Sequence, residues 1–193
     1  MTVVLPAVPE ADAELIRASL ERPDRFGGLY DRYAAQLYRY AFRRVGAPAE
    51  DVVADTFLAA FQGRHKYDLG RPDARPWLFG ILTRKLADRV SSERAYHREL
   101  AVADLASDDP ADRVAARVSA EASHVPLLTA LGRLSRGERD VLLLIAWGQL
   151  SYEEVAAALK MPLGTVRSRL SRARRKVRDA LGGVNPINTE EDR

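Results

Sequence analysis

Along most of the chain, apolar residues recur at intervals of three and four positions, which is the spacing of one face of an α-helix. The clearest case lies in residues 165–178, where Val166, Leu170, Ala173 and Val177 step by four, three and four. The pattern predicts helices over residues 13–21, 24–45, 49–62, 73–98, 126–134, 136–147, 152–160 and 165–181. We therefore expect an all-α protein.

Residues with special backbone preferences mark the ends of several of these helices. Asp12 is expected to cap the first helix, and Pro23 to end it. Gly46 is expected to close the second helix, and Pro48 to open the third.

The second half of the chain contains two copies of the S-x-x-E pattern. Ser135 with Glu138, and Ser151 with Glu154, each predict a capping box at the start of a helix. Residues 161–164 predict a tight turn that joins helix 152–160 to helix 165–181. Two short helices joined by a tight turn that contains glycine have the layout of a helix-turn-helix.

The last predicted helix is strongly cationic outside its apolar stripe. Residues 165–178 include seven basic residues and no acidic one. A solvated surface helix, a membrane-surface helix and a DNA-binding helix all share these features. The capped helix and the turn before it favour DNA, because a helix-turn-helix places the start of its second helix in the major groove.

Charge divides the chain into segments. The net charge of the 193 residues is only +3, yet residues 99–123 carry six acidic and two basic residues. This Ala-, Asp- and Ser-rich segment predicts an acidic linker with partial helical tendency. We expect helical domains at residues 10–98 and 126–183, a linker at 99–125 and a disordered tail at 184–193.

Composition excludes several classes of chemistry. The chain has no cysteine, so disulfides and thiolate chemistry are impossible. Residues 1–12 lack the features of a signal peptide, and no run approaches the roughly 18 apolar residues of a membrane span. A soluble, cytoplasmic protein is therefore expected.

The histidines and carboxylates give no sign of a catalytic centre. His65, His97 and His124 are scattered and fall in no metal-binding motif, and the carboxylates have no metal-site grouping. We expect no catalytic residues, no metal and no other cofactor, and an enzyme acting on nucleic acid is a less favoured class.

Two features of the first half have both a structural and a functional interpretation. Basic residues lie near Tyr67, Trp77 and Phe79, a combination that suits single-stranded nucleic acid, although the Trp77 and Phe79 rings also fit a core. Acidic residues in the first turns of helix 49–62 complement the helix dipole, but they equally suit contact with a partner.

The motifs resemble the sigma-70 family of bacterial RNA polymerase sigma factors. The second domain contains an L-x-x-L opening, Arg139, S-Y-E-E-V-A and G-T-V-R-S-R-L-x-R-A-R, as in region four of that family. The first contains F-x-x-L-Y-x-x-Y, A-E-D-V-V-x-D-T-F-L-A-A-F and R-P-W-L-F-G-I, as in region two. Because no third globular region fits between them, the chain resembles the extracytoplasmic-function (ECF) group.

The resemblance implies two sets of contacts in the first domain. Helix 49–62 would dock on the clamp coiled coil of the polymerase β′ subunit through Glu50, Asp51, Asp55, Phe57 and Phe61. The loop and the helix that follow would melt and bind the −10 promoter element. The residues implied there are His65, Lys66, Tyr67, Arg75, Trp77, Phe79, Arg84, Lys85 and Arg89.

In the second domain, the resemblance implies recognition of the −35 element. Arg167, Ser168, Ser171 and Arg172 match positions that face base pairs, whereas Thr165, Arg169, Arg174, Arg175 and Lys176 are expected on phosphates. The chain departs from the family pattern at Ala54, Arg84 and Met161, where Gln, Asn and a hydroxyl N-cap residue are usual. Open backbone N–H groups at Met161 are expected to suit a phosphate.

The implied partners are core RNA polymerase, through its β′ clamp coiled coil and β flap, and promoter DNA. An anti-sigma factor is a further candidate, and no membrane partner is expected. The acidic linker would thread toward the polymerase active centre, where it would be displaced by the growing transcript. A free-standing helix-turn-helix regulator is the alternative, although such a protein needs neither a melting surface nor a docking helix.

Overall fold

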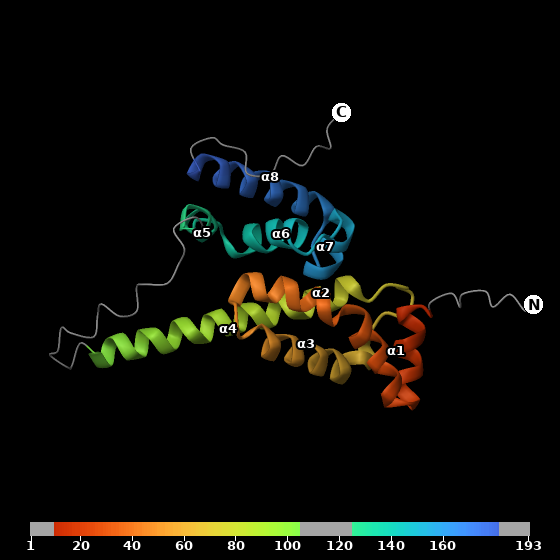
Figure 1. Ribbon diagram of the computed structural model, residues 1–193. Helices are drawn as coiled ribbons and strands as arrows, with labels where there is room; N and C mark the ends of the chain where they lie inside the picture. The colour runs from red at the N-terminus through yellow and green to blue at the C-terminus, as the bar shows by residue number, and fades with distance from the viewer. Residues whose placement is uncertain (1–9, 105–124, 182–193) are drawn as a thin grey trace, which may run out of the picture. The chain divides into compact units, whose positions relative to one another are not determined.

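The computed structural model describes residues 10–104 and 125–181, and every regular element in these ranges is a helix (Figure 1). The all-α prediction is therefore confirmed. The described chain divides into two units. The first is built on α1, α2, α3 and the start of α4, and the second on α5, α6, α8 and most of α7. The predicted tail at 184–193 lies outside the described residues, as do residues 105–124 of the predicted linker.

The first unit begins with α1 (Asp12–Glu21), a 3₁₀ turn (Pro23–Phe26) and α2 (Gly27–Val45). The single helix predicted over 24–45 is therefore two elements. Pro23 begins the tighter turn, in which the Arg25 N–H lies 3.0 Å from the Arg22 carbonyl oxygen. Gly46 ends α2 as predicted, with a φ of +68° that favours glycine.

The remainder of the first unit consists of α3 (Ala49–Gly63), a 3₁₀ turn (Arg64–Lys66) and α4 (Arg75–Asp104). α2 and α3 pack against each other. The rings of Tyr40 and Phe79 lie edge to face, 5.3 Å apart, and the side chains of Ile16, Leu29 and Leu37 are fully buried. α4 runs to residue 104 rather than 98, because residues 99–104 include good helix formers and no proline or glycine.

The second unit contains α5 (Val125–Gly132), α6 (Arg136–Ala146), α7 (Tyr152–Leu159) and α8 (Leu163–Ala180). Both predicted capping boxes are present. The Glu138 N–H donates to Ser135 Oγ at 3.4 Å, and the Glu154 N–H donates to Ser151 Oγ at 3.1 Å. The side-chain carboxylate of each glutamate in turn accepts from the backbone N–H of its serine, at 3.0 Å for Glu138 and 2.6 Å for Glu154.

Arg139 fixes the end of α5 onto α6. Its Nε donates to the Leu131 carbonyl oxygen at 2.9 Å and its Nη2 to the Leu134 carbonyl oxygen at 3.2 Å. The last carbonyl groups of a helix lack partners within it, so this arginine satisfies groups that would otherwise need water.

The turn before α8 differs from the prediction. α8 begins at Leu163, two residues earlier than expected, and Pro162 rather than Met161 occupies the N-cap position. Lys160 makes the turn with a φ of +51°. Pro162 provides no side-chain acceptor, but its carbonyl oxygen accepts the Thr165 N–H at 2.9 Å. The expectation for Met161 as the N-cap residue is therefore wrong.

Candidate nucleic-acid and protein interfaces

α8 separates its apolar and basic residues as its sequence predicts. Val166, Leu170, Ala173 and Val177 are all buried, at most 5% exposed. The exposed residues of the helix include Arg167, Ser168, Ser171, Arg172, Arg174, Arg175 and Arg178. The buried stripe fixes the helix in the unit, so its remaining surface presents a dense array of guanidinium groups.

A groove of about 450 Å³ runs along one flank of α8. Its lining residues are Tyr152 from α7 and, from α8, Arg167, Leu170, Ser171, Arg174, Arg175 and Arg178. This lining includes arginines but no acidic side chain, a chemistry that suits a phosphate group. Tyr152 and Arg178 were not identified from the sequence as site residues. The signal for Arg178 was its position four residues after Arg174, on the same helix face.

Two residues on the opposite flank of α8 contact α6 or the turn before α8. Lys176 Nζ lies 2.8 and 3.0 Å from the carboxylate oxygens of Glu138, which is only 6% exposed. Arg169 Nη1 lies 3.9 Å from Met161 Sδ, and a Cβ on Gly137 would come within 2.5 Å of it. Both cations of this flank therefore have contacts inside the unit.

The pKa of Glu138 is lowered to about 2. The hydrogen bond from Lys176 is the largest cause, and the Ser135 backbone N–H is the next. The carboxylate therefore stays charged at neutral pH and joins the capping box of α6 to α8.

The exposed face of α3 combines acidic residues with one large apolar residue. Glu50, Asp51 and Asp55 are exposed, and Leu58 is 55% exposed. The aromatic residues expected beside them lie elsewhere: Phe57 is only 7% exposed, and Phe61 is half-buried with its ring 5.4 Å from that of Phe26. Phe57 therefore packs in the core of the first unit, and its implied contact with the polymerase stays a prediction.

A groove of about 480 Å³ lies between α2 and α3. It is lined by Tyr30, Ala34, Ala35 and Tyr38 from α2 and by Glu50, Val53 and Ala54 from α3. The Tyr30 side chain is 51% exposed, and its ring lies 4.9 Å from that of Phe57. Tyr30 therefore contributes exposed aromatic surface to this groove.

The residues that the resemblance implies for −10 binding, before and within α4, differ in exposure. His65, Lys66 and Arg84 are exposed, whereas Arg75, Lys85 and Arg89 are half-buried. The Trp77 ring is half-buried and lies 4.9 Å from that of Tyr67. Phe79 is fully buried, so the structure places it in the core and not on a nucleic-acid surface.

Tyr67 is buried and holds the loop that follows it. Its hydroxyl lies 2.8 Å from the Arg71 carbonyl oxygen and 3.0 Å from the Asp73 carbonyl oxygen. Burial is the largest of the causes that raise the pKa of Tyr67 to about 12, so the hydroxyl remains a donor at neutral pH. Tyr67 therefore holds the loop through hydrogen bonds from a buried position and is not exposed on the loop surface.

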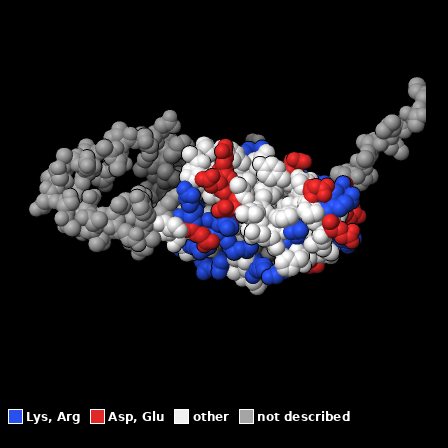
Figure 2. Space-filling view, turned by 90° about the horizontal axis from the view of Figure 1, so that it is seen from below, with Lys and Arg blue, Asp and Glu red and all other residues white. Residues whose placement is uncertain are grey.

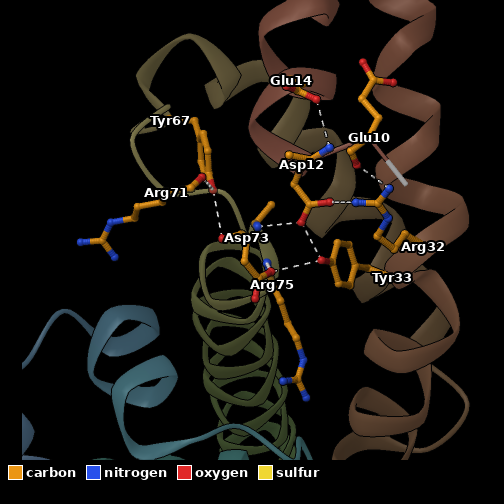
Figure 3. A network of polar contacts seen from close by, with 11 residues as sticks. Glu10, Asp12, Glu14, Arg32, Tyr33, Tyr67, Arg71, Asp73 and Arg75 are labelled. Atoms are coloured by element: carbon orange, nitrogen blue, oxygen red, sulfur yellow. Dashed lines mark hydrogen bonds and ion pairs between the residues drawn. The ribbon is translucent and has the colours of Figure 1, made fainter. Parts of the chain in front are cut away.

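Asp12 does not cap α1 as the sequence predicts. Its side chain is only 2% exposed and points into a polar network that joins α1, α2 and the start of α4 (Figure 3). Its Oδ2 accepts from the Tyr33 hydroxyl at 2.6 Å and from the Ala74 N–H at 2.8 Å. Its Oδ1 pairs with Arg32. The N-cap position of α1 is instead Ala11.

Two family matches account for most of the chain. Residues 29–96 match Sigma-70 region 2, and residues 124–177 match Sigma-70, region 4. The sequence is 32% identical over 180 residues to the RNA polymerase sigma factor NccH of Alcaligenes xylosoxydans xylosoxydans, covering 89% of this chain and 94% of that protein. The chain belongs to the sigma-70 family.

Further relatives place this sigma factor in the ECF group. It is 35% identical over 174 residues to the ECF RNA polymerase sigma factor SigL of Mycobacterium tuberculosis, covering 89% of this chain and 91% of that one. The structure of CnrH in complex with the cytosolic domain of CnrY matches with a TM-score of 0.62 and 30% identity, over 89% of this chain and 97% of that chain. Sigma factors direct transcription initiation, and this is the role of the present chain.

The charges on the surface of this sigma factor are clustered. On the face in Figure 2, Lys and Arg side chains gather in a patch toward the lower left, with a small acidic group inside it. Among the described residues, no three His, Cys, Asp or Glu side chains are grouped to hold a metal ion. None of the described helices has both the length and the apolar character needed to cross a membrane.

Proposed function

We propose that this sigma factor directs RNA polymerase to promoters through two DNA contacts and one protein contact. In this proposal α8 reads the −35 element as duplex, and the segment from the turn at Arg64–Lys66 into α4 binds the separated −10 strand. The exposed face of α3 and its groove with α2 dock on the core polymerase. The arginine-rich face of α8, opposite a fully buried apolar stripe, is the observation that supports the proposal most strongly.

For the −35 element, the face of α8 formed by Arg167, Ser168, Ser171 and Arg172 reads bases. All four are exposed, and they are spaced as neighbours on one helix face. An arginine can bond to both acceptors of guanine in the major groove, and one such pair discriminates by about 1–3 kcal/mol.

Phosphates bind on either side of that face. Arg174 and Arg175 are exposed, and with Tyr152 and Arg178 they line the groove along α8, so we add Tyr152 and Arg178 to the predicted contacts. Phosphate contacts fix the register of the protein on the duplex without reading its sequence. Thr165, Arg169 and Lys176 remain predicted phosphate contacts, the last two in addition to their contacts within the unit.

For the −10 element, the exposed side chains of His65, Lys66 and Arg84 meet the strand. Trp77, whose ring is only half-buried, offers a face on which a base can stack. Extrusion of a base costs a few kcal/mol of stacking, which contacts to the separated strand offset. No covalent step is required.

The α3 face has the chemistry to bind a basic helical partner. Its three acidic residues attract cations, and the 55% exposed side chain of Leu58 provides apolar area at the same site. The β′ clamp coiled coil is the partner that the family resemblance implies for this helix, and the β flap is a further contact that it implies on the polymerase.

An anti-sigma factor is a further proposed partner. The related CnrH was solved with the cytosolic domain of CnrY. RpoE of Bartonella quintana was solved with the anti-sigma factor NepR, and it matches with a TM-score of 0.56 and 27% identity over 81% of this chain and 96% of that chain. Control of the present chain by such a protein would not need a cysteine or metal sensor of its own.

In vitro transcription with core polymerase on a promoter library tests the proposal. Defined start sites with shared −35 and −10 sequences are expected, and failure to direct any start site would refute it. Asp51→Lys should weaken core binding, because it places a cation on the acidic face, whereas Glu21→Lys on α1 is the matched control. Duplex binding by the chain alone that is as tight as with core polymerase would favour the free-standing regulator.

A further inference from the structure

The loop between Tyr67 and Ala74 has an ordered backbone although it contains no regular helix. The Arg71 N–H donates to the Asp68 carbonyl oxygen at 3.0 Å, and the Gly70 N–H donates to Asp68 Oδ1 at 3.1 Å. The Tyr67 hydroxyl bonds to two carbonyl oxygens further along the same loop. These bonds give the loop its internal shape, but none of them fixes its position in the unit.

The position of the loop is fixed at its end, by α1 and α2. Asp12 of α1 accepts the Ala74 N–H at 2.8 Å, immediately before α4 begins at Arg75. The first N–H groups of a helix need acceptors from outside it, and here one acceptor comes from a residue 62 positions earlier. The Asp12 carboxylate therefore holds the start of α4 against α1.

Tyr33 of α2 makes a second connection to the same place. Its hydroxyl lies 2.6 Å from Asp12 Oδ2 and 3.1 Å from Asp73 Oδ1, and Asp73 Oδ1 also accepts the Arg75 N–H at 2.8 Å. Burial and the neighbouring Asp12 carboxylate raise the pKa of Tyr33, so its proton stays available to both acids.

Arg32 completes the network. It pairs with Asp12 Oδ1, and its Nη2 donates to the Glu10 carbonyl oxygen at 2.9 Å. The nearly buried carboxylate thus has a cationic partner and two further donors, which is what a charge so far from water requires. Figure 3 shows these side chains pointing toward one another, while the side chain of Arg71 points away from them.

We propose that Asp12 and Tyr33 are positioning residues for recognition of the −10 strand, an inference that rests on the proposed function. They touch no DNA. They hold the end of the loop and the first turn of α4, where Trp77 lies, in one arrangement before the strand arrives. Because the loop is already ordered when the strand binds, binding does not have to order it. The network also sets where the groups that contact the bases lie, so base discrimination depends on it.

A merely structural role would predict something different. If the network only stabilised the fold of the first unit, its loss would lower all activities of that unit together. A positioning role predicts a selective loss of −10 discrimination, with core polymerase affinity and −35 duplex binding unchanged. Two variants separate these roles: Asp12→Asn removes the charge at constant size, and Tyr33→Phe removes only the hydroxyl.

The experiment uses holoenzyme assembled from core polymerase and the full chain. The probes are fluorescent single-stranded oligonucleotides that carry either the −10 sequence selected by the wild type from a promoter library or a scrambled sequence. The readout is the ratio of the two affinities. We expect Asp12→Asn to lower this ratio by about tenfold and Tyr33→Phe by about threefold, because small misplacements of binding groups have effects of this order.

Tyr40→Phe is the matched control. It also removes a buried tyrosine hydroxyl from α2, one that accepts from Arg44 of the same helix at 3.1 Å. The discrimination ratio of this variant should equal that of the wild type, even where its melting temperature falls as far as that of Tyr33→Phe. Hydrogen exchange should also be faster at the Ala74 amide in both test variants and unchanged there in the control.

The possible results distinguish a failure of the positioning role from a failure of the proposed function on which it rests. If both test variants keep the wild-type ratio of affinities, whatever their melting temperatures, the positioning role is overturned. A ratio that falls equally in Tyr40→Phe also overturns it, since general destabilisation would then be the cause. If the wild-type holoenzyme itself shows no preference between the two strands, the proposed function fails, and the inference fails with it.

Discussion

The ion pair between Lys176 and Glu138 allows a quantitative prediction about how α8 is held. Lys176→Met removes the ammonium group but keeps most of the aliphatic stem. Breaking a fully buried pair costs about 3–5 kcal/mol, whereas a surface pair contributes about 0–1 kcal/mol. Here the Glu138 side chain is 8% exposed and that of Lys176 is 42% exposed, so the pair lies between these limits. We expect the second unit to lose about 2 kcal/mol of stability.

Hydrogen exchange followed by mass spectrometry measures this loss in the full chain, because peptides from α6 and α8 report on the second unit alone. A loss of about 2 kcal/mol lowers their protection by roughly thirtyfold. Arg175→Met is the matched control, since Arg175 is an exposed cation on the same helix, and its effect should stay within about 0.5 kcal/mol. Equal protection in wild type and Lys176→Met would refute the reasoning, as would an equally large loss in the control.

The pH dependence provides a second check on the same pair. The folded-state pKa of Glu138, about 2, lies below the ordinary value of 4.5, so the bound carboxylate stabilises the fold when charged. Its contribution is complete above pH 4.5 and is lost progressively as the pH falls toward 2. The difference between wild type and Lys176→Met should therefore be constant above pH 4.5 and narrow below it.

Two further predictions concern DNA recognition and the backbone. Arg172→Ala should relax the preference at one −35 base pair by about 1–3 kcal/mol. Arg175→Ala should instead weaken binding to all sequences, and should reduce by about one the slope of the logarithm of the binding constant against the logarithm of the salt concentration. Titrations of promoter variants at several salt concentrations distinguish the two effects. Gly46→Ala should destabilise the first unit by about 1–3 kcal/mol in thermal unfolding, because its φ of +68° strains any other residue. Gly63→Ala, at a φ of −89° with open space around it, should not destabilise the protein, and a comparable loss there would contradict the assignment of strain.

Features that depend on neighbours in the chain were predicted well from the sequence. The two capping boxes need only a serine and a glutamate three residues apart, and both are present in the structure. The buried stripe of α8 follows from apolar residues at steps of four and three. The family motifs are likewise local patterns, and the family matches confirm the identification drawn from them.

Features that depend on distant contacts were missed. Asp12 precedes a helix and has the chemistry of an N-cap, but its partners lie 20, 21 and 62 residues away. No local pattern reports those separations. The sequence left two interpretations of Phe79 open for a related reason, because aromatic residues fit both a core and a surface, and only packing decides which.

The separation of Asp12 from Ala74 also bears on the order in which the first unit folds. A contact 62 residues apart brings a large loop-closure entropy, whereas α2 and α3 meet across a connection of only a few residues. During synthesis, α1 leaves the ribosome long before the start of α4 exists. We therefore expect a nascent chain to acquire the acidic face of α3 first and the final arrangement of the loop last. Such a chain would have its proposed polymerase-docking face before the loop that is proposed to discriminate a promoter is in place.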